Sequence, residues 1–306
     1  MKKVIPIFFI EMLQKQYGDE ITNKIMDGYL QEKPVTLRVN SIKSDMKNIK
    51  TKLENENIKF KEVSWNKDAL ILESAKEERI KELDMYQNGE IYLQSLSSMI
   101  PPIILNPTQK ENILDMAAAP GGKTTQIAAM TDNNAMITAC EKNKIRAERL
   151  KYNLEKQGAG SVSVILEDAR KLSEFFSFDK ILLDAPCSGS GTSNVYSEKF
   201  SKELIDRSAK TQEILLRKAL QILKPGKEMV YSTCSILLQE NENVLKKVLK
   251  DIDAEIVKID KIVDIPLLPT SIEGTLCICP NRLYEGFFVA KIRKKQFDKK
   301  QRIMLP

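Results

Sequence analysis

The sequence of 306 residues contains no histidine. An imidazole base is therefore unavailable, which excludes hydrolases that depend on a Ser-His-Asp or Cys-His arrangement. Internal repeats and low-complexity tracts are also absent. If this chain uses a nucleophile, a thiol with a second thiol beside it becomes the natural candidate.

The chain lacks a run of about 20 apolar residues, the length that a membrane-spanning helix needs. Its first ten residues, MKKVIPIFFI, begin like a secretory signal. However, Pro6 interrupts the apolar run, Glu11 follows it, and no small-residue cleavage site is present. We therefore expect an amphipathic first helix with Pro6 in its first turn, and a cytoplasmic protein without a membrane segment.

The five cysteines are odd in number and lack the spacing of a disulfide framework. We therefore predict reduced thiols, because disulfides are rare in a reducing compartment. A metal site would need more thiol or imidazole ligands than the sequence offers, so no metal is expected. Cys277 and Cys279 lie in an alternating apolar segment and are expected to pack in a core or sheet edge.

The hydrophobic share of 42% and the charged share of 29% are typical of a soluble globular protein. The formal net charge is +6, and the tail from residue 291 to residue 306 alone carries a net charge of +6. The positive and negative charges of the rest of the chain therefore cancel. A basic tail suits a phosphate-rich partner such as RNA. A solvated terminus without a partner explains it equally well. The oligomeric state cannot be inferred, and a monomer is assumed.

The pattern of elements changes near residue 88. Before it, helical segments near 6–17 and 20–30, a strand at 34–40, a further helix and strands near 58–64 and 69–72 predict a small α+β domain over 1–88. After it, strict alternation of strands and helices predicts a second domain over 89–306 with a parallel sheet covered on both faces. We expect parallel strands at 112–116, 135–140, 162–166, 180–184 and 228–232. We expect helices at 122–130, 142–157 and 201–223, and two final strands within 275–292.

The first strand of the second domain runs into DMAAAPGGKTT. Small residues between a strand and a helix allow the backbone to approach a ligand at the helix N-terminus. A phosphate loop of a P-loop ATPase is an alternative, since Gly122, Lys123 and Thr124 fit its end. However, Ala117 replaces its first glycine, and Pro120 removes a backbone donor where the phosphates would bind.

Two carboxylates follow the next two strands. Glu141 lies some 20 residues beyond the glycine-rich turn, where an acidic residue can bind ribose hydroxyls. Asp168 follows the third strand and can accept a hydrogen bond from an exocyclic amine. Either residue alone could be an ordinary helix-capping acid, but their order at successive strand ends favours a nucleoside-containing cofactor.

The two candidate nucleophiles follow the fourth and fifth strands. Asp184 and Cys187 begin the segment DAPCSGSGT, whose glycines and serines predict a mobile loop that approaches a ligand closely. Cys234 follows the fifth strand in YSTCS. If these strands are neighbours, their axes lie about 4.8 Å apart and both thiols open into one cleft. A single buried cysteine is ordinarily structural, whereas two at matching strand ends favour function.

Together these segments resemble the Sun/Fmu (RsmB/Nop-type) family of S-adenosylmethionine-dependent RNA (cytosine-5) methyltransferases. DMAAAPGGKT looks like the family's cofactor loop, ILLDAPCSGSGT like its fourth motif, and YSTCS with the later ENE like its nucleophile motif. Upstream, TLRVN and GEIYLQSLSSM look like its N-terminal RNA-binding unit and the junction that follows. The resemblance implies a class I methyltransferase fold, Rossmann-like with a mostly parallel seven-stranded sheet, and a small N-terminal α+β RNA-binding domain.

The resemblance also implies roles for individual residues. Cys234 would attack the cytosine, Cys187 would assist product release, and Asp184 would lie at the target base and also contact the cofactor. Glu141 would bind the ribose and Asp168 the adenine end of S-adenosylmethionine. The methionine and ribose loop would comprise Ala117, Ala118, Ala119, Pro120, Gly121, Gly122 and Lys123.

The resemblance implies ribosomal RNA as substrate, with transfer RNA as the alternative. The chain departs from the family pattern at Leu276, where an arginine is usual, and at Asn281, where a histidine is usual. We interpret both as the loss of a peripheral contact. Two other interpretations stay open: a methyltransferase of the same fold acting on another acceptor, and a catalytically silent RNA-binding or ribosome-assembly factor. Activation of Cys234 is expected from a nearby helix N-terminus, and assistance to the base from Asp184.

Overall fold

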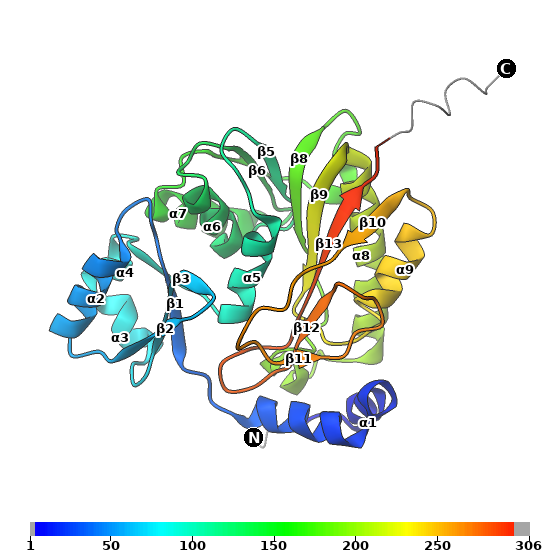
Figure 1. Ribbon diagram of the computed structural model, residues 1–306, viewed down its shortest axis with the longest axis horizontal. Coiled ribbons are helices and arrows are strands. Elements are labelled where there is room, and N and C mark those ends of the chain that lie inside the picture. The colour runs from blue at the N-terminus through cyan, green and yellow to red at the C-terminus, as the bar shows by residue number, and fades with distance from the viewer. Residues whose placement is uncertain (1–3, 297–306) are drawn as a thin grey trace.

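The computed structural model describes residues 4–296 and consists of a small sheet unit beside a large sheet with helices on both faces (Figure 1). Lys299, Lys300 and Arg302 of the basic tail lie outside the described residues. No helix within the described range is long and apolar enough to cross a membrane.

The first helix does not belong to the small sheet unit in space. Helix α1 (Ile7–Leu30) bends at Gly18, whose φ of 76° interrupts the helical backbone, so the two expected helical segments are confirmed as halves of one bent helix. It lies against the large-sheet side of the molecule (Figure 1). The ring of Phe9 meets that of Phe200 edge-on at 5.1 Å between centroids. Helix α1 therefore packs beside the C-terminal part of the chain.

The small sheet has the order β2-β3-β1-β4, and its pairs are antiparallel. β4 lies beyond residue 88, the expected end of the first domain, and it pairs with β1, so the small sheet crosses that boundary. The helices near it are short and carry the apolar residues that form its core. The bounds are β1 Val35–Val39, β2 Phe60–Val63, β3 Asn66–Leu72, β4 Ile91–Leu93, α2 Met46–Asn55, α3 Glu77–Glu82 and α4 Asp84–Gln87.

The large sheet has the strand order β11-β12-β13-β9-β8-β5-β6-β7, and β10 pairs with β13. The five strands from β9 to β7 are parallel, while β10 to β13 add antiparallel pairs. The bounds are β5 Asn112–Asp115, β6 Met136–Cys140, β7 Val162–Ile165, β8 Phe178–Asp184, β9 Leu223–Thr233, β10 Ala254–Val257, β11 Leu267–Leu268, β12 Leu276–Ile278 and β13 Phe287–Lys294.

The class I methyltransferase fold expected from the sequence is present, but the expected strand number of seven was wrong. Over residues 4–296 the large sheet contains nine strands. The difference comes from β10 and the two-residue β11, which are too short or too irregular in pattern to stand out in the sequence. The two final strands do pair antiparallel, as expected.

Helices cover both faces of the large sheet (Figure 1). The central strands β5, β8 and β9 carry continuous apolar runs because they are buried on both sides. One core contains residues of α5, α6 and α7, and the other contains residues of α1, α8 and α9. The bounds are α5 Leu96–Leu105, α6 Gly122–Met130, α7 Lys144–Gln157, α8 Lys202–Ile222 and α9 Glu242–Leu249.

Two polar side chains, one in β1 and one directly after it, attach the small sheet to the large unit. The guanidinium of Arg38, only 2% exposed, donates to Gln94 Oε1 at 3.0 Å and to Thr125 Oγ1 on α6 at 2.9 Å. The amide of Asn40 donates to the carbonyl oxygens of Gly89 and of Gln157 on α7, each at 2.8 Å. These buried bonds fix the small sheet against α6 and α7.

Candidate active site

The carboxyl ends of the parallel strands meet at one cavity of about 250 Å³. This is the edge where open α/β sheets bind ligands. The cavity brings together Glu141 and Asp168 from the predicted cofactor set with Asp184 and both candidate cysteines. The residues that line it include Ala117, Ala119, Glu141, Asp168, Asp184, Cys187 and Cys234.

The loop from Ala117 to Lys123 is held from beneath by Asp115. Its carboxylate accepts a hydrogen bond from Thr124 Oγ1 at 2.7 Å and one from the Ala117 amide at 3.4 Å. Burial raises the pKa of Asp115 to about 6, although the bond from Thr124 and the charge of Lys123 oppose the rise.

The two glycines of this loop have distinct structural reasons. Gly121 adopts a φ of +110°, in the region that favours glycine. A Cβ on Gly122 would lie 3.0 Å from the ring of Tyr92. The glycines therefore serve the turn and its packing. Ala117 and Ala119 line the cavity described above and also a second, smaller cavity beside it.

Glu141 and Asp168 both border the cavity, and each already has hydrogen-bond partners. Glu141 is 4% exposed, accepts from the Asn143 amide at 2.8 Å and faces Arg146 at 3.4 Å. Asp168 accepts from the Arg170 side chain through both carboxylate oxygens, which lowers the pKa of Asp168 to about 2. Both carboxylates line the cavity, and their roles toward a cofactor stay predictions. Asp168 also caps a short 3₁₀ helix, the alternative role considered for it.

Lys123 contacts Asp184 rather than occupying a phosphate cradle. Its ammonium lies 2.7 Å from Asp184 Oδ2 and donates to Ser98 Oγ at 2.8 Å. Asp184 Oδ1 accepts from Ser232 Oγ at 2.8 Å, across the β8–β9 pair. Burial acts to lower the pKa of Lys123, but Asp184, Asp115 and Cys234 outweigh it and the pKa is raised. The ammonium therefore stays charged beside both Asp184 and Cys234, which argues against the P-loop alternative.

The sulfurs of Cys187 and Cys234 lie 3.0 Å apart. β8 and β9 are parallel neighbours, and Asp184 of β8 pairs with Ser232 of β9. The expected adjacency of the two strands is therefore confirmed. The hydrogen bond to Cys234 and burial raise the pKa of Cys187 well above its ordinary value. The two thiols therefore share one hydrogen bond, in which either sulfur can donate. Cys277 and Cys279 are 2% and 1% exposed and pack in the core, as expected.

The loop after Cys187 is buried, so the prediction of a mobile loop was wrong. Ser188 and Ser190 are both 0% exposed. A Cβ on Gly191 would lie 1.9 Å from the carbonyl oxygen of Gly286, and the two glycines share a 2.7 Å backbone hydrogen bond. Small residues in this loop permit close packing against the last strand and its preceding turn.

A helix N-terminus does lie close to the Cys234 loop, as expected. Asn241 precedes α9, and its side chain accepts from Thr233 Oγ1 at 2.5 Å and donates to the Ser235 carbonyl at 2.9 Å. It bonds the residues on both sides of Cys234 but not the sulfur. The charged group beside Cys234 is Lys123, which sequence reasoning had assigned to the cofactor loop alone.

A second cavity, of about 220 Å³, adjoins the first at Ala117, Ala119 and Asp184. Its lining includes Tyr92, Gln94 and Ser98 from the segment GEIYLQSLSSM. Sequence reasoning took this segment as a junction and missed its contribution to the site. Its resemblance to a family motif was the available signal.

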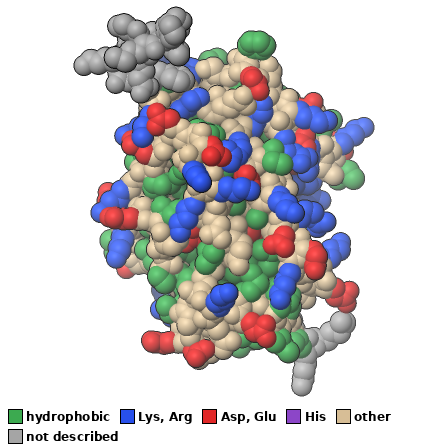
Figure 2. Space-filling view, turned by 90° about the vertical axis from the view of Figure 1, so that its right-hand side faces the viewer, with side chains coloured by type: hydrophobic (Ala, Val, Ile, Leu, Met, Phe, Trp, Pro, Cys, Tyr) green, Lys and Arg blue, Asp and Glu red, His purple; other side chains and the backbone are tan. Residues whose placement is uncertain are grey.

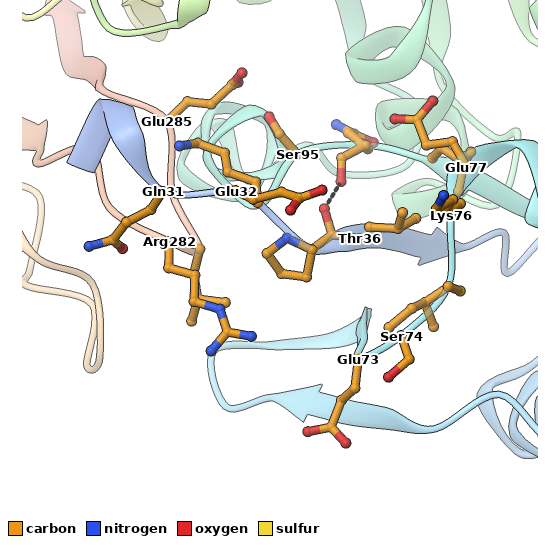
Figure 3. A pocket seen from close by; sticks show the side chains of 18 of the residues that line it. Gln31, Glu32, Thr36, Glu73, Ser74, Lys76, Glu77, Ser95, Arg282 and Glu285 are labelled. Atoms are coloured by element: carbon orange, nitrogen blue, oxygen red, sulfur yellow. Dashed lines mark hydrogen bonds between the residues drawn. The ribbon is translucent and has the colours of Figure 1, made fainter. Parts of the chain in front are cut away.

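A cavity of about 920 Å³ lies between the small sheet, the α1–β1 connection and the loop at 282–285 (Figure 3). It shares Leu93, Gln94 and Ser95 with the second cavity. Asn281 folds the adjoining turn by accepting from the amides of Leu283 and Tyr284 at 2.8 Å. Carboxylates outnumber cations around this cavity, which disfavours it as a phosphate channel. The charged residues are Glu32, Glu73, Glu77, Glu78, Glu285, Lys33, Lys76 and Arg282.

Figure 2 shows a face on which positive and negative side chains are interspersed. On α8 and α9 the opposite charges pair with one another: Glu213 pairs with Arg217 and Lys247, and Arg217 also pairs with Asp251. Such a surface offers no continuous basic track for a polyphosphate backbone. In the part of the chain that the structure describes, no group of three Cys, Asp or Glu side chains could hold a metal ion.

Comparison with known proteins decides the family. The model of the 16S rRNA methyltransferase RsmB/F family matches residues 102–293, and the ferredoxin-like domain of RsmF/B-like methyltransferases matches residues 5–77. The chain belongs to the RsmB/F methyltransferase family. Members of this family use S-adenosylmethionine, so the predicted family, fold and cofactor are confirmed at that level.

Two curated relatives illustrate the range of the family. The ribosomal RNA small subunit methyltransferase F of Shewanella baltica is 32% identical over 92% of this chain, which spans only 63% of that relative. A tRNA (cytosine(49)-C(5))-methyltransferase of Pyrococcus abyssi is 34% identical over 85% of this chain and 88% of its own length.

Two solved structures share the fold. A methyltransferase homolog from Pyrococcus horikoshii has a TM-score of 0.81 and 32% identity, and the match covers 95% of this chain and all of the other. NSun6 from Pyrococcus horikoshii, crystallised with SFG, has a TM-score of 0.87 and 24% identity, covering 96% and 99% of the two chains. The second likeness supports the fold alone.

Proposed function

We propose that this protein is an RNA (cytosine-5) methyltransferase that acts on ribosomal RNA, with transfer RNA as the alternative substrate. The observation that carries the proposal is the pair of sulfurs 3.0 Å apart beside the Lys123–Asp184 ion pair. The proposal includes a cytoplasmic location, which suits five free thiols. It also includes RNA binding by the small N-terminal unit.

Two adjoining cavities, of about 250 and 220 Å³, support S-adenosylmethionine binding at the carboxyl ends of the parallel strands. Glu141 would hold the ribose hydroxyls, and Asp168 would face the adenine end. The loop from Ala117 to Gly122 would pass beneath the methionine end, close to Asp184. The cofactor supplies an electrophilic methyl group on its sulfonium sulfur. The chain must therefore make C5 of cytosine nucleophilic and later remove its proton.

Cys234 supplies that activation. Its sulfur adds to C6 of the cytosine, which gives C5 enamine character, and C5 then takes the methyl group. Loss of the C5 proton to a solvent base and cleavage of the C6–S bond, whose electron pair returns to sulfur, restore the aromatic ring and free the thiolate. Lys123 stabilises the negative charge on the attacking sulfur, since its ammonium lies within electrostatic reach of Cys234.

Cys187 and Asp184 act beside the nucleophile. The proton that Cys187 holds is available to the Cys234 sulfur at 3.0 Å, so Cys187 assists the departure of that sulfur from C6. Asp184, held by Lys123 and Ser232, faces the same cavity and orients the base.

Lys123 and Asp184 lie at the same site as the two thiols that line the cavity, and this arrangement argues against a catalytically silent RNA-binding factor. The decisive experiment is bisulfite sequencing of total RNA from a deletion strain that carries either the wild-type gene or its Cys234→Ala variant. The proposal predicts a methylated cytosine in ribosomal RNA that appears only with the wild-type gene. Identical methylation maps in the two strains would contradict it, and a site confined to transfer RNA would select the alternative substrate.

A further inference from the structure

Glu240 lies between the two loops that carry the thiols. It is 0% exposed. Its Oε1 accepts from the Ser188 amide at 2.7 Å, and its Oε2 accepts from Ser188 Oγ at 2.5 Å and Ser235 Oγ at 2.7 Å. Ser188 directly follows Cys187, and Ser235 directly follows Cys234. One carboxylate thus bonds the residue after each cysteine.

The backbone at Glu240 adds a further constraint. Its carbonyl oxygen accepts from Tyr231 Oη at 2.6 Å, and Tyr231 belongs to β9, the strand that leads to Cys234. Ser190 Oγ and Ser235 Oγ, 2.7 Å apart, join the same two loops a second time. The two thiol loops are therefore connected through a buried polar network centred on Glu240.

Burying the carboxylate of Glu240 costs desolvation free energy. Among the ion pairs of residues 4–296 none includes Glu240, so hydrogen bonds alone offset the burial of its carboxylate. Burial raises the pKa of Glu240, and the bonds from Ser188, Ser235 and Gln212 oppose that rise. An apolar side chain would fill the space without this penalty, as replacements of buried charged groups in other proteins show.

We propose that Glu240 is a positioning residue, whose carboxylate sets the separation of Cys187 and Cys234 without touching the substrate. The two sulfurs lie 3.0 Å apart because both loops are bonded to one carboxylate: Ser188 bonds both of its oxygens, and Ser235 bonds Oε2. The kinetic consequence rests on the proposed function, whereas the distance between the sulfurs does not.

The charge of Glu240 has a second effect in the same direction. After the bond to Cys234 and burial, the charge of Cys234 and that of Glu240 further raise the pKa of Cys187. The charge of Glu240 therefore disfavours the thiolate form of Cys187.

The test compares Glu240→Gln with Asp179→Asn as a control. Glutamine keeps the shape of the glutamate side chain, but its amide nitrogen cannot accept the bonds that one carboxylate oxygen accepts. Asp179 is also a hydrogen-bonded carboxylate, which accepts from the Asn112 amide at 3.1 Å and from Lys224 at 2.9 Å, but it lies near the start of β8, at the end of the strand away from both thiol loops.

Two measurements are made on the full-length variants. The first is the rate at which diamide closes a Cys187–Cys234 disulfide, followed by mass spectrometry of the linked peptides, which needs no RNA. The second is kcat and KM for RNA methylation. We expect Glu240→Gln to close the disulfide at least ~10-fold more slowly and to lose kcat by about 10- to 100-fold, the effect of a misplacement near 1 Å, with KM for S-adenosylmethionine unchanged. Asp179→Asn should match the wild type in both.

A wild-type rate of disulfide closure in Glu240→Gln overturns the proposal, whatever its activity. If Glu240→Gln fails to unfold cooperatively, Ser188→Ala serves as the second variant, because it removes one bond to the carboxylate and leaves the backbone bond. Closure in Ser188→Ala at the wild-type rate then overturns the proposal as well. If the wild-type protein lacks RNA methylation but closure slows in Glu240→Gln, the proposed function fails while the positioning role stands.

Discussion

The sulfurs of Cys187 and Cys234 lie 3.0 Å apart although they follow two different strands of the large sheet. The bond between them and burial raise the pKa of Cys187. The proposed function gives the two thiols different roles and therefore different expected phenotypes.

The two cysteine variants should therefore behave differently. Cys234→Ala removes the attacking sulfur and should reduce turnover by at least ~10³-fold, with no protein–RNA adduct. Cys187→Ala leaves the attack intact but slows release, so it should accumulate a protein–RNA adduct that survives denaturing gel electrophoresis. Cys277→Ala, a buried cysteine outside the cavity, serves as the control. Equal adduct yields from the Cys187 and Cys234 variants would contradict the assignment.

Replacement of Lys123 tests its role beside Cys234. Lys123→Met removes the ammonium that pairs with Asp184 at 2.7 Å, so the negative charge of the attacking sulfur loses its nearby cation. We expect kcat to fall by about 10²- to 10³-fold, the range seen when one electrostatic group is removed from an active site. The exposed Lys151→Met is the control. A wild-type kcat for Lys123→Met would exclude this role.

The Arg38 bonds predict a stability effect at the seam between the two sheets. Arg38→Met leaves buried acceptors on Gln94 and Thr125 without their donor, at about 1–3 kcal/mol for each unsatisfied group. Thermal and urea unfolding should show a loss of roughly 2–6 kcal/mol in the free energy of unfolding. The exposed Arg79→Met should change it by less than about 0.5 kcal/mol. Equal losses in the two variants would show that the seam does not depend on Arg38.

Asp115 predicts a pH dependence of stability. Its folded pKa, about 6, exceeds its ordinary value of 3.8, so the folded state holds the proton more tightly than the unfolded state does. This contribution to stability is fully present below pH 3.8 and is lost as the pH rises through 6. It amounts to at most about 3 kcal/mol, at about 1.36 kcal/mol per pKa unit.

The measurement is the free energy of unfolding of the wild type and Asp115→Asn at intervals between pH 4 and 7. The variant should lose less stability than the wild type over this range, because asparagine carries no titrating proton. Parallel curves for the two proteins would show that Asp115 does not titrate between these pH values.

The sequence predicted the parallel strands and the site at their ends because these follow from local patterns. Buried strands such as β8 carry continuous apolar runs, and the residue after each run falls at the same edge of the sheet. The adjacency of Asp184, Cys187 and Cys234 followed from the strand order of the fold class. These features need no knowledge of distant side-chain contacts.

The features that the sequence did not predict depend on tertiary contacts. Pattern alone gave no sign that Lys123 would pair with Asp184, or that Gly191 would pack against Gly286. β4 is three residues long and gains its identity as a strand only by pairing with β1. Glu240 was visible only as part of a family motif, since its partners Ser188 and Ser235 come together through the pairing of β8 and β9.

The most direct test of the central claim is the release of tritium from RNA labelled at C5 of cytosine. Ribosomal and transfer RNA are prepared with [5-³H]cytidine and incubated with the protein and S-adenosylmethionine carrying a ¹⁴C-labelled methyl group. Our account predicts one tritium released for each methyl group transferred by the wild type, and neither event with Cys234→Ala. Methyl transfer without tritium release would contradict it, because the methyl group would then lie at another atom.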